Sequence, residues 1–454
     1  MASLSREMLA LAGAIARAPR QLPAAVADKA KHHLIDSLAA MVSGAVLLPG
    51  RQAIRYVEQL GGRKEASVPG TRLVTSAIHA AMAGGMCAHA DETDDSHQPA
   101  FFHPGCAIVP AVWAMAEREH APGIAVLDAI VLGYEVGARV SFALGAMAFH
   151  HRGLSSHTFA GTFGAAAAAG RLARLDLQQS AWLMSYAAQQ ASGISTWMRD
   201  SDHVEKAFAL GGMTARNAVT AATMVQSGMT AVDDVFAGTP NFFSAFAPGG
   251  STEALLGDWD ASPEILRANI KKWSVGSPIQ ASLDAMESLL REHRFRADDI
   301  ERIDVEVRDD EAGIVDNRVV PNICLQHLLA LMVVDGTLTF ASSHDASRMA
   351  DPRVLRVRER VAFQGSAALR AAGGRQAIVA VTTRDGTRLR RHVEVVRGAA
   401  GNPMSDDEVI AKAAGLMAPV LGERRVRRVT DAVRTLEACA DVTTLRGSLQ
   451  LTRP

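Results

Sequence analysis

The stretch SHTFAGTFGAAAAAGRL, residues 156–172, decides the fold class of this chain of 454 residues. It is rich in alanine, the residue with the highest helix propensity, and therefore predicts a helix. Segments of similar composition recur at 77–90, 105–118 and 215–228. Because small side chains let helix axes approach closely, these segments favour a compact helical bundle over a solenoid.

The helical pattern extends from this stretch in both directions. Towards the N-terminus, apolar residues between positions 34 and 42 recur every three to four residues, as on one face of a helix. Towards the C-terminus the pattern holds until about residue 260. The segment APGGSTEALLGDWDASPEI, residues 247–265, then interrupts it with the Gly, Pro, Ser and Asp residues that are typical of a domain boundary.

Beyond this boundary the sequence alternates between strand and helix patterns. Residues 300–307, IERIDVEV, largely alternate apolar and polar side chains and predict a strand. Residues 377–381 and 391–396 flank an Asp-Gly turn and predict a hairpin. Helical patterns at 278–292 and 322–335 lie between these strands, which indicates a small α+β domain.

These patterns together predict a mainly α protein, in which a large all-helical domain is followed by a smaller α+β domain with an antiparallel sheet. The expected boundaries are 1–265 for the helical domain and 266–400 for the α+β domain. Residues 401–454 are expected to be helical again and to pack on the first domain. Ser405 and Glu408 have the spacing of a capping box, which predicts the start of that last helical segment.

Composition excludes several classes of function. Lys and Arg total 47 against 48 for Asp and Glu, so no global field attracts nucleic acid or an anionic membrane. No apolar run reaches the roughly 20 residues that a transmembrane helix needs, and no secretory signal pattern is present. The four cysteines are widely spaced and favour a reducing compartment. We therefore expect a soluble cytoplasmic protein.

The densest polar cluster is HADETDDSH, residues 89–97, followed by His103-Pro104-Gly105. Four carboxylates and three histidines within 15 residues are costly to place together unless they hydrogen-bond, bind a cation or transfer protons. One alternative is that some of the acids cap the helix that begins near Gly105. Another is a metal site, although the spacing lacks the tight pattern of known zinc motifs.

Three further polar clusters stand near predicted helix starts or the domain junction. A cluster at 152–158 opens the alanine-rich helix, where free N–H groups favour an anion. A second cluster at 199–206 contains Lys206, and a third at 271–280 lies where the two domains join. Each signal is weak alone, since a lone histidine or lysine at a helix end is more often structural than catalytic.

The order of these segments resembles the MmgE/PrpD family along nearly the whole chain. The similar phrases are IDSLAAMVSG at 35–44, the HA-x-(D/E)-x-DD-(T/S)-H pattern at 89–97 with HPG after it, SHTFAGTFGAAAAAGRL at 156–172, AAQQASG at 187–193, and a K-x-(Y/W) entry to the second domain. The resemblance implies 2-methylcitrate dehydratase, cis-aconitate decarboxylase or iminodisuccinate epimerase activity, with no metal and no organic cofactor. It also implies a homodimer.

The resemblance also implies which residues do the work. The expected catalytic residues are His103, His157, Lys206, Lys271 and Glu92, and the expected substrate-binding residues are Ser96, Asp95, Arg152, Lys272 and Gln280. Lys271 and Lys272 compete for the second lysine position of the family. The chain departs from the family pattern after Lys206, where Leu210-Gly211-Gly212 replaces a His-Pro-Gly phrase, and at Gln280, where many members have histidine. Both departures weaken the expectation of a citrate-type substrate.

The leading hypothesis is a lyase, with a hydro-lyase favoured, that moves a proton next to a carboxylate of a small di- or tricarboxylate. The two lysines supply fixed cations for the charge that develops, and a neutral imidazole takes the proton near pH 7. An epimerase or a decarboxylase on the same scaffold stays open. So do a non-catalytic small-anion binding protein and a metal-dependent hydrolase.

Overall fold

The computed structural model describes residues 4–257, 259 and 262–451, which form two compact units. The first unit runs to Asn269 and resumes at Asp406, and the second comprises Ile270–Ser405. The sequence placed these boundaries at 265 and 400. Asn269 stays with the first unit because its backbone N–H donates to the carbonyl of Ser96 over 2.7 Å and its carbonyl accepts from the Ser96 N–H over 3.0 Å.

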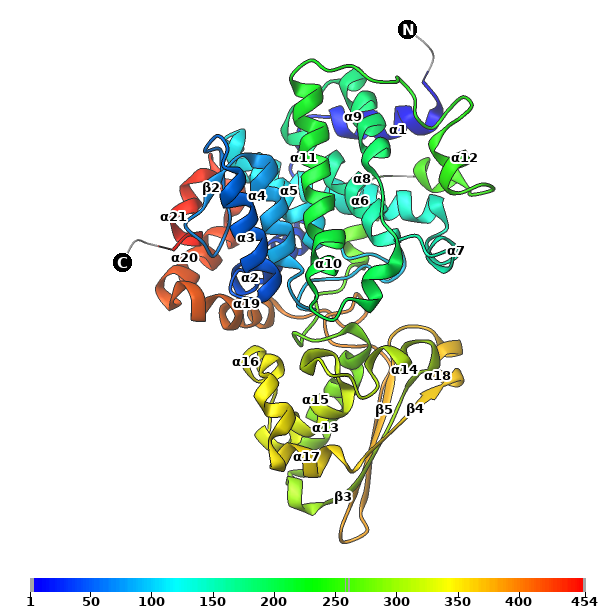
Figure 1. Ribbon diagram of the computed structural model, residues 1–454, viewed down its shortest axis with the longest axis vertical. Helices are drawn as coiled ribbons and strands as arrows, with labels where there is room; N and C mark the ends of the chain where they lie inside the picture. Colours follow the sequence, from blue (N-terminus) through cyan, green and yellow to red (C-terminus); the bar gives the residue numbers. More distant parts are fainter. Residues whose placement is uncertain (1–3, 258, 260–261, 452–454) are drawn as a thin grey trace. The chain divides into compact units, whose positions relative to one another are not determined.

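Helices build the first unit, as the sequence predicted (Figure 1). They are α1 (Arg6–Ala16), α2 (Ala24–Gly44), α3 (Leu48–Leu60), α4 (Ala77–Ala88), α5 (Gly105–Arg118), α6 (Gly123–Leu144), α7 (Ala146–His151), α8 (Ser156–Leu172), α9 (Leu177–Gln190), α10 (Val204–Ala207), α11 (Met213–Gln226), α12 (Phe242–Phe246), α19 (Asp406–Leu421), α20 (Glu423–Arg434) and α21 (Arg446–Leu449). The one ladder among the unit's described residues pairs the two-residue strands β1 (Ala66–Ser67) and β2 (Val74–Thr75).

The alanine-rich helix α8 is the centre of this unit. All of its residues are buried, and α5, α6, α9 and α11 pack around it. Its approach to α6 is so close that a Cβ on Gly164 would lie 2.5 Å from the carbonyl oxygen of Gly133. The small residues therefore bring the helix axes together, as the sequence predicted.

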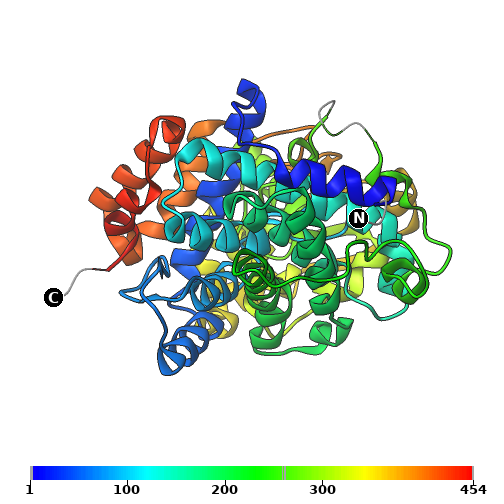
Figure 2. The same ribbon diagram turned by 90° about the horizontal axis from the view of Figure 1, so that it is seen from above.

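The C-terminal helices return to the first unit. Helix α19 packs on α2 through the buried residues Val409, Ala413, Leu416 and Met417. Figure 2 shows the C-terminal helices, in orange and red, gathered on one side of this unit. The return segment is thus part of the core that α2 belongs to.

The second unit contains a four-stranded sheet in the order β4-β3-β5-β6. The strands are β3 (Ile300–Arg308), β4 (Val361–Ser366), β5 (Ala377–Thr383) and β6 (Arg388–Val393). Strands β3, β5 and β6 are antiparallel, as expected, but β4 runs parallel to β3, with Val305 opposite Phe363. The sheet is therefore mixed rather than purely antiparallel. The long helical connection between β3 and β4 allows this, because a parallel partner requires a crossover.

The second hairpin strand begins earlier than the sequence predicted. The expectation was 391–396, whereas β6 starts at Arg388, which pairs with Thr382. The turn closes tightly because the N–H of Thr383 donates to the carbonyl of Thr387 over 2.9 Å, so that pairing resumes at the next residue.

Helices cover one face of this sheet (Figure 1). The helices of the unit are α13 (Gln280–His293), α14 (Asp309–Val315), α15 (Leu325–Asp335), α16 (Phe340–His344), α17 (Pro352–Arg358) and α18 (Ala367–Ala372). Alternate residues of β3, namely Ile303, Val305 and Val307, are buried in the same hydrophobic cluster as Leu283 and Met286 of α13. The period-two pattern read from the sequence thus marks the core face of the strand.

A membrane-spanning helix is not found in the part of the chain that the structure describes. No single helix there is both long and apolar enough to cross a membrane. Helices α2 and α3 reach the required length and hydropathy only when taken together, and the chain bends by 82° between them.

Candidate active site

Four histidines from distant segments of the first unit meet in one cluster, which we call the histidine cluster: His89, His103, His157 and His203. His89 follows α4, His103 precedes α5, His157 is the second residue of α8, and His203 precedes α10. The ring of His89 lies 5.2 Å from that of His103 and 5.2 Å from that of His203, measured between centroids. His103 stacks on His157 at 5.3 Å with 29° between the planes. The structure therefore brings the two sequence-predicted histidines together.

Carboxylates from the loop at 89–97 fix these rings. Asp94 Oδ2 lies 2.9 Å from Nδ1 of His89 and 3.3 Å from Nδ1 of His103. Nδ1 of His103 is also 2.7 Å from the backbone carbonyl of Asp95. A carbonyl oxygen only accepts hydrogen bonds, so Nδ1 of His103 carries a proton. Its Nε2 is then the nitrogen that can exchange a proton with a substrate.

A second pair of candidate residues, Glu92 and Lys206, is in contact. The ammonium of Lys206 is hydrogen-bonded to Oε1 of Glu92, which also lies 3.8 Å from Nε2 of His203. The same ammonium is 5.4 Å from the ring centroid of Trp197, which belongs to the 3-10 turn η1 (Ser195–Arg199). These contacts place a fixed cation and a carboxylate beside the histidine cluster.

His157 is held as a neutral base. Burial lowers its pKa well below the usual range, and the nearby His103 and Lys206 lower it further. Trp197 meets its ring edge-on at 5.5 Å, and Phe101 lies 5.1 Å away. Its Nδ1 is buried and has no hydrogen-bond partner among the residues of the described chain. A neutral imidazole with an uncommitted nitrogen can accept a proton near pH 7.

His203 is a functional candidate that the sequence analysis did not single out, and His89 was considered there only as a ligand in the metal-site alternative. Both stood inside the quoted polar segments, but nothing in the local pattern separated them from capping residues. His203 has a positive φ of 60°, an uncommon backbone conformation for a non-glycine residue. Desolvation lowers its pKa to about 3, with a further contribution from Lys206. Only the long-range fold reveals that the two rings are adjacent.

Asp95 was expected to bind substrate, and in the structure its carboxylate is engaged by groups of the protein. Its side chain is fully buried, with Oδ2 2.6 Å from Nδ1 of His33 and 2.5 Å from the Tyr134 hydroxyl, which donates to it. Its Oδ1 accepts from the N–H of Gly105 over 2.7 Å. Burial alone would raise the pKa of Asp95, but the hydrogen bonds from His33 and Tyr134 hold it lowered. Asp95 therefore caps α5 and anchors the loop, which is the capping alternative considered from the sequence.

Two other expected binding residues take different positions. Arg152 is exposed, donates to the carbonyl of Phe246 and lies 5.5 Å over the ring of Phe149, so it does not join the histidine cluster. Ser96 is 4% exposed, and its backbone is paired with Asn269 as described above. The Ser96 hydroxyl thus stays at the buried end of the polar loop.

The remaining candidates lie in the second unit. Lys271 is 3% exposed, whereas Lys272 pairs with Glu287 and lies 4.5 Å over the ring of Trp273. Gln280 was expected to bind substrate, but its side chain accepts from the Trp273 N–H over 3.1 Å and donates to the Trp273 carbonyl over 2.8 Å. Gln280 therefore closes the Lys271–Gln280 loop on itself.

The site also offers two sets of ligands suited to a metal ion. The sets are His89, Asp94 and His103, and His89, Glu92 and His203, each with its ligand atoms within 4.8 Å of one another. Imidazole and carboxylate are ligands that zinc accepts. The ammonium of Lys206 on Glu92 disfavours a cation in the second set, because like charges repel.

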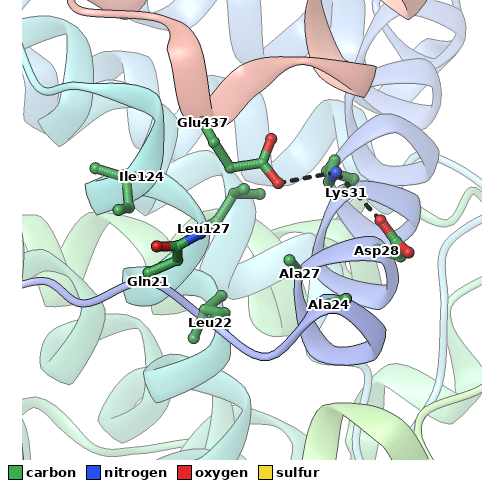
Figure 3. Close-up of a pocket in the computed structure, with 9 residues that line it drawn as sticks. All are labelled: Gln21, Leu22, Ala24, Ala27, Asp28, Lys31, Ile124, Leu127 and Glu437. Carbon is green, nitrogen blue, oxygen red and sulfur yellow. Dashed lines mark ion pairs between the residues drawn. The ribbon is translucent and has the colours of Figure 1, made fainter.

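A separate pocket lies on the outer side of α2 (Figure 3). It has a volume of about 270 Å³ and is lined by Gln21, Leu22, Ala24, Ala27, Asp28, Lys31, Ile124, Leu127 and Glu437. Lys31 is already paired with Asp28 at 3.2 Å and Glu437 at 2.9 Å. No histidine lines it, and its one lysine is already paired with its two carboxylates, so the pocket lacks the chemistry of the histidine cluster.

Comparisons with known proteins match most of the chain. Residues 10–254 match the model of the MmgE/PrpD N-terminal domain, and residues 273–438 match that of the MmgE/PrpD C-terminal domain. The cis-aconitate decarboxylase-like protein oryM of Aspergillus oryzae is 25% identical, over 94% of this chain and 93% of the relative. A cis-aconitate decarboxylase of Aspergillus terreus is 23% identical, over 93% of this chain and 91% of the relative.

Proposed function

Since the chain belongs to the MmgE/PrpD family, we propose that it is a lyase that needs no cofactor and acts on a small di- or tricarboxylate by proton transfer next to a carboxylate. One observation carries the proposal: the stacked rings of His103 and His157 stand beside the Lys206–Glu92 pair. Two imidazoles and a held cation are the parts that such a proton transfer requires.

The roles follow from the environment of each group. His157 is the base, because its lowered pKa keeps it neutral and able to accept a proton. His103 is the acid: in its doubly protonated form it delivers the Nε2 proton, while Nδ1–H stays bonded to the Asp95 carbonyl. Lys206 stabilises the negative charge that develops on the substrate carboxylate, and a catalytic role for Lys271 stays a prediction from the family resemblance. Glu92 holds Lys206 in place.

Two reactions use these parts. In elimination, the base takes the α-proton, the electron pair forms the C=C bond, and the hydroxyl leaves as water with a proton from the acid. In decarboxylation, the C–C bond to the carboxylate breaks, CO₂ leaves, and the acid protonates the carbon that keeps the electron pair. Because one relative is named a cis-aconitate decarboxylase and another a cis-aconitate decarboxylase-like protein, decarboxylation of that compound is to be tested alongside elimination.

The test is incubation in D₂O with a panel of di- and tricarboxylates, followed by proton NMR. A new vinyl signal indicates elimination, loss of CO₂ indicates decarboxylation, and deuterium exchange without net change indicates epimerisation. If no compound in the panel responds, the non-catalytic anion-binding function replaces this proposal.

A metal-dependent hydrolase is a second candidate, favoured by the ligand spacing of His89, Asp94 and His103. It predicts stoichiometric metal in the purified protein and loss of activity on chelation. Elemental analysis together with turnover after dialysis against EDTA separates it from the lyase, for which we expect unchanged turnover.

Assembly and location are further parts of the proposal. We propose a homodimer, on the family resemblance, and a reducing compartment such as the cytoplasm, because all four cysteines are free thiols. Light scattering of the purified protein tests the first.

A further inference from the structure

Two helices that carry none of the proposed catalytic residues contact the loop at 89–97, which we call the catalytic loop. Helix α2 contacts the loop through His33, whose Nδ1 lies 2.6 Å from Asp95. Helix α19, from the C-terminal return, contacts it through Lys412. These two supports touch the loop on either side of Asp94, the residue that orients His89 and His103.

Lys412 makes two buried contacts. Its ammonium lies 2.6 Å from Oδ1 of Asp36 on α2, with side chains only 6% and 1% exposed, respectively. The same ammonium donates to the backbone carbonyl of Thr93 over 3.1 Å. Asp36 lies three residues after His33, about one helical turn, so the side chains of His33 and Asp36 project from the same face of α2.

The Thr93 carbonyl, which accepts from Lys412, lies between two residues of the proposed site. Thr93 stands between Glu92, which holds Lys206, and Asp94, which holds two histidines. Asp91 locks Thr93 further, by accepting from its N–H and from its hydroxyl, each over 2.8 Å. A shift of this peptide would therefore displace the acid–base and the cationic parts of the site at once.

We propose that Lys412 is a positioning residue, which uses Asp36 and the Thr93 carbonyl to fix the catalytic loop. The inference rests on the proposed function of the histidine cluster. It makes the C-terminal helix α19 a component of the active site rather than only a cover for α2. Displacement of reacting groups by about 1 Å can cost roughly a hundredfold in rate, so the loss of such a support is expected to be visible in turnover.

A purely structural ion pair is the alternative, and a double variant separates the two. Removing Lys412 alone would leave Asp36 buried without its counter-charge, which is destabilising by itself. Asp36→Asn combined with Lys412→Met removes both charges and the bond to Thr93 together. We expect kcat to fall by about tenfold to a hundredfold with KM changed by less than about threefold. The single variant Lys412→Arg keeps a charged donor beside Asp36, so its kcat should lie between that of the double variant and that of wild type.

The matched control is the buried pair of Arg171 and Asp128, which also lies in the first unit. Arg171 likewise donates to backbone carbonyls, those of Ala14 and Ile15. It lies 14 residues beyond His157 on α8, roughly 21 Å at 1.5 Å per residue. Asp128→Asn with Arg171→Met should lower the melting temperature and leave kcat within about twofold.

Amide hydrogen exchange at residues 91–97 supplies a readout that does not depend on turnover. The Asp36/Lys412 variant should exchange faster there than wild type, and the Asp128/Arg171 variant should not. If the wild-type protein turns over none of the polycarboxylates but the exchange difference is present, the proposed function fails while the support by Lys412 stands. If kcat and loop exchange in the Asp36/Lys412 variant match those of the Asp128/Arg171 control, the inference is wrong.

Discussion

Lys206 is the cation that the structure places on Glu92 beside the histidine cluster, so its removal is the most direct test of the proposed charge stabilisation. We expect Lys206→Ala to lower kcat/KM by about 10²–10³, corresponding to roughly 2–4 kcal/mol of transition-state energy. Lys31→Ala, which removes a lysine from the separate pocket on α2, is the control and should change kcat/KM by less than about twofold. Similar losses in both variants would mean that Lys206 acts only through stability.

His103 and His157 divide the acid and base roles in the proposed mechanism. Replacing either with Gln should keep the melting temperature nearly unchanged and remove most turnover, about 10²–10⁴. An unperturbed imidazole titrates at about pH 6.5. Because burial lowers the pKa of His157, the base stays neutral at that pH, and kcat/KM should fall only at lower pH, as the folded-state pKa is approached. A pH–rate profile of wild type checks this, and a midpoint at or above 6.5 for the fall in rate on the acidic side contradicts it.

At the scale of elements, the contact between α4 and the π-helical turn η2 (Phe208–Gly212) sets the position of Lys206. A Cβ on Gly85 of α4 would lie 2.4 Å from the carbonyl oxygen of Gly211. The glycines of this turn, which depart from the family phrase, are thus explained by close helix approach.

Gly85→Ala should therefore destabilise the protein by about 1–3 kcal/mol and also lower kcat, since η2 must shift. Gly415→Ala is the matched control, because Gly415 is exposed on α19 and a Cβ there meets nothing within 4 Å. That change should stabilise the helix by up to about 1 kcal/mol. Urea denaturation of both variants tests the pair, and equal effects would contradict the packing argument.

At the scale of the whole molecule, the first unit is discontinuous in sequence. A fragment ending at residue 265 lacks α19 and would expose the face of α2 on which that helix packs. We expect it to be poorly soluble, and co-expression of residues 401–454 should raise the soluble fraction. Size-exclusion chromatography and circular dichroism check this. A monodisperse, fully helical 1–265 fragment would show that the return segment is dispensable.

Several buried histidines make the folded protein sensitive to acid. Burial lowers the pKa of His33 and His327 to about 4 and that of His203 to about 3. An unfolded histidine titrates near 6.5, so the unfolded chain binds more protons below that pH, and the free energy of unfolding should fall as pH drops from 6.5 towards 4. Asp36, whose pKa burial raises to about 6, has the opposite sign and offsets about one proton.

Urea midpoints at pH 7 and pH 5 measure this loss of stability. His327→Leu is the informative variant, because both ring nitrogens of His327 are buried without hydrogen-bond partners among the residues described. Its stability should depend on pH less steeply than that of wild type. An unchanged slope would mean that His327 is not held neutral by the fold.

The sequence by itself determined the elements and the family. Helix propensity and periodicity are local properties, so α4, α5, α8 and α11 follow from composition within each segment. The hairpin of β5 and β6 follows from its Asp-Gly turn, although the start of β6 was predicted three residues late. Strand direction is not local, and the parallel pairing of β4 with β3 could not be read from the sequence.

Only the tertiary structure decided which polar residues act together. His89, His157 and His203 are far apart in sequence, and long-range packing alone makes their rings neighbours. It also separated Glu92, which pairs with Lys206, from Asp95, which is buried on His33 and Tyr134. Glu92 and Asp95 are both carboxylates of one short loop, so the sequence alone does not distinguish their roles. Burial and partners give them different roles, because desolvation and hydrogen bonds set the charge and reach of a side chain only in the folded state.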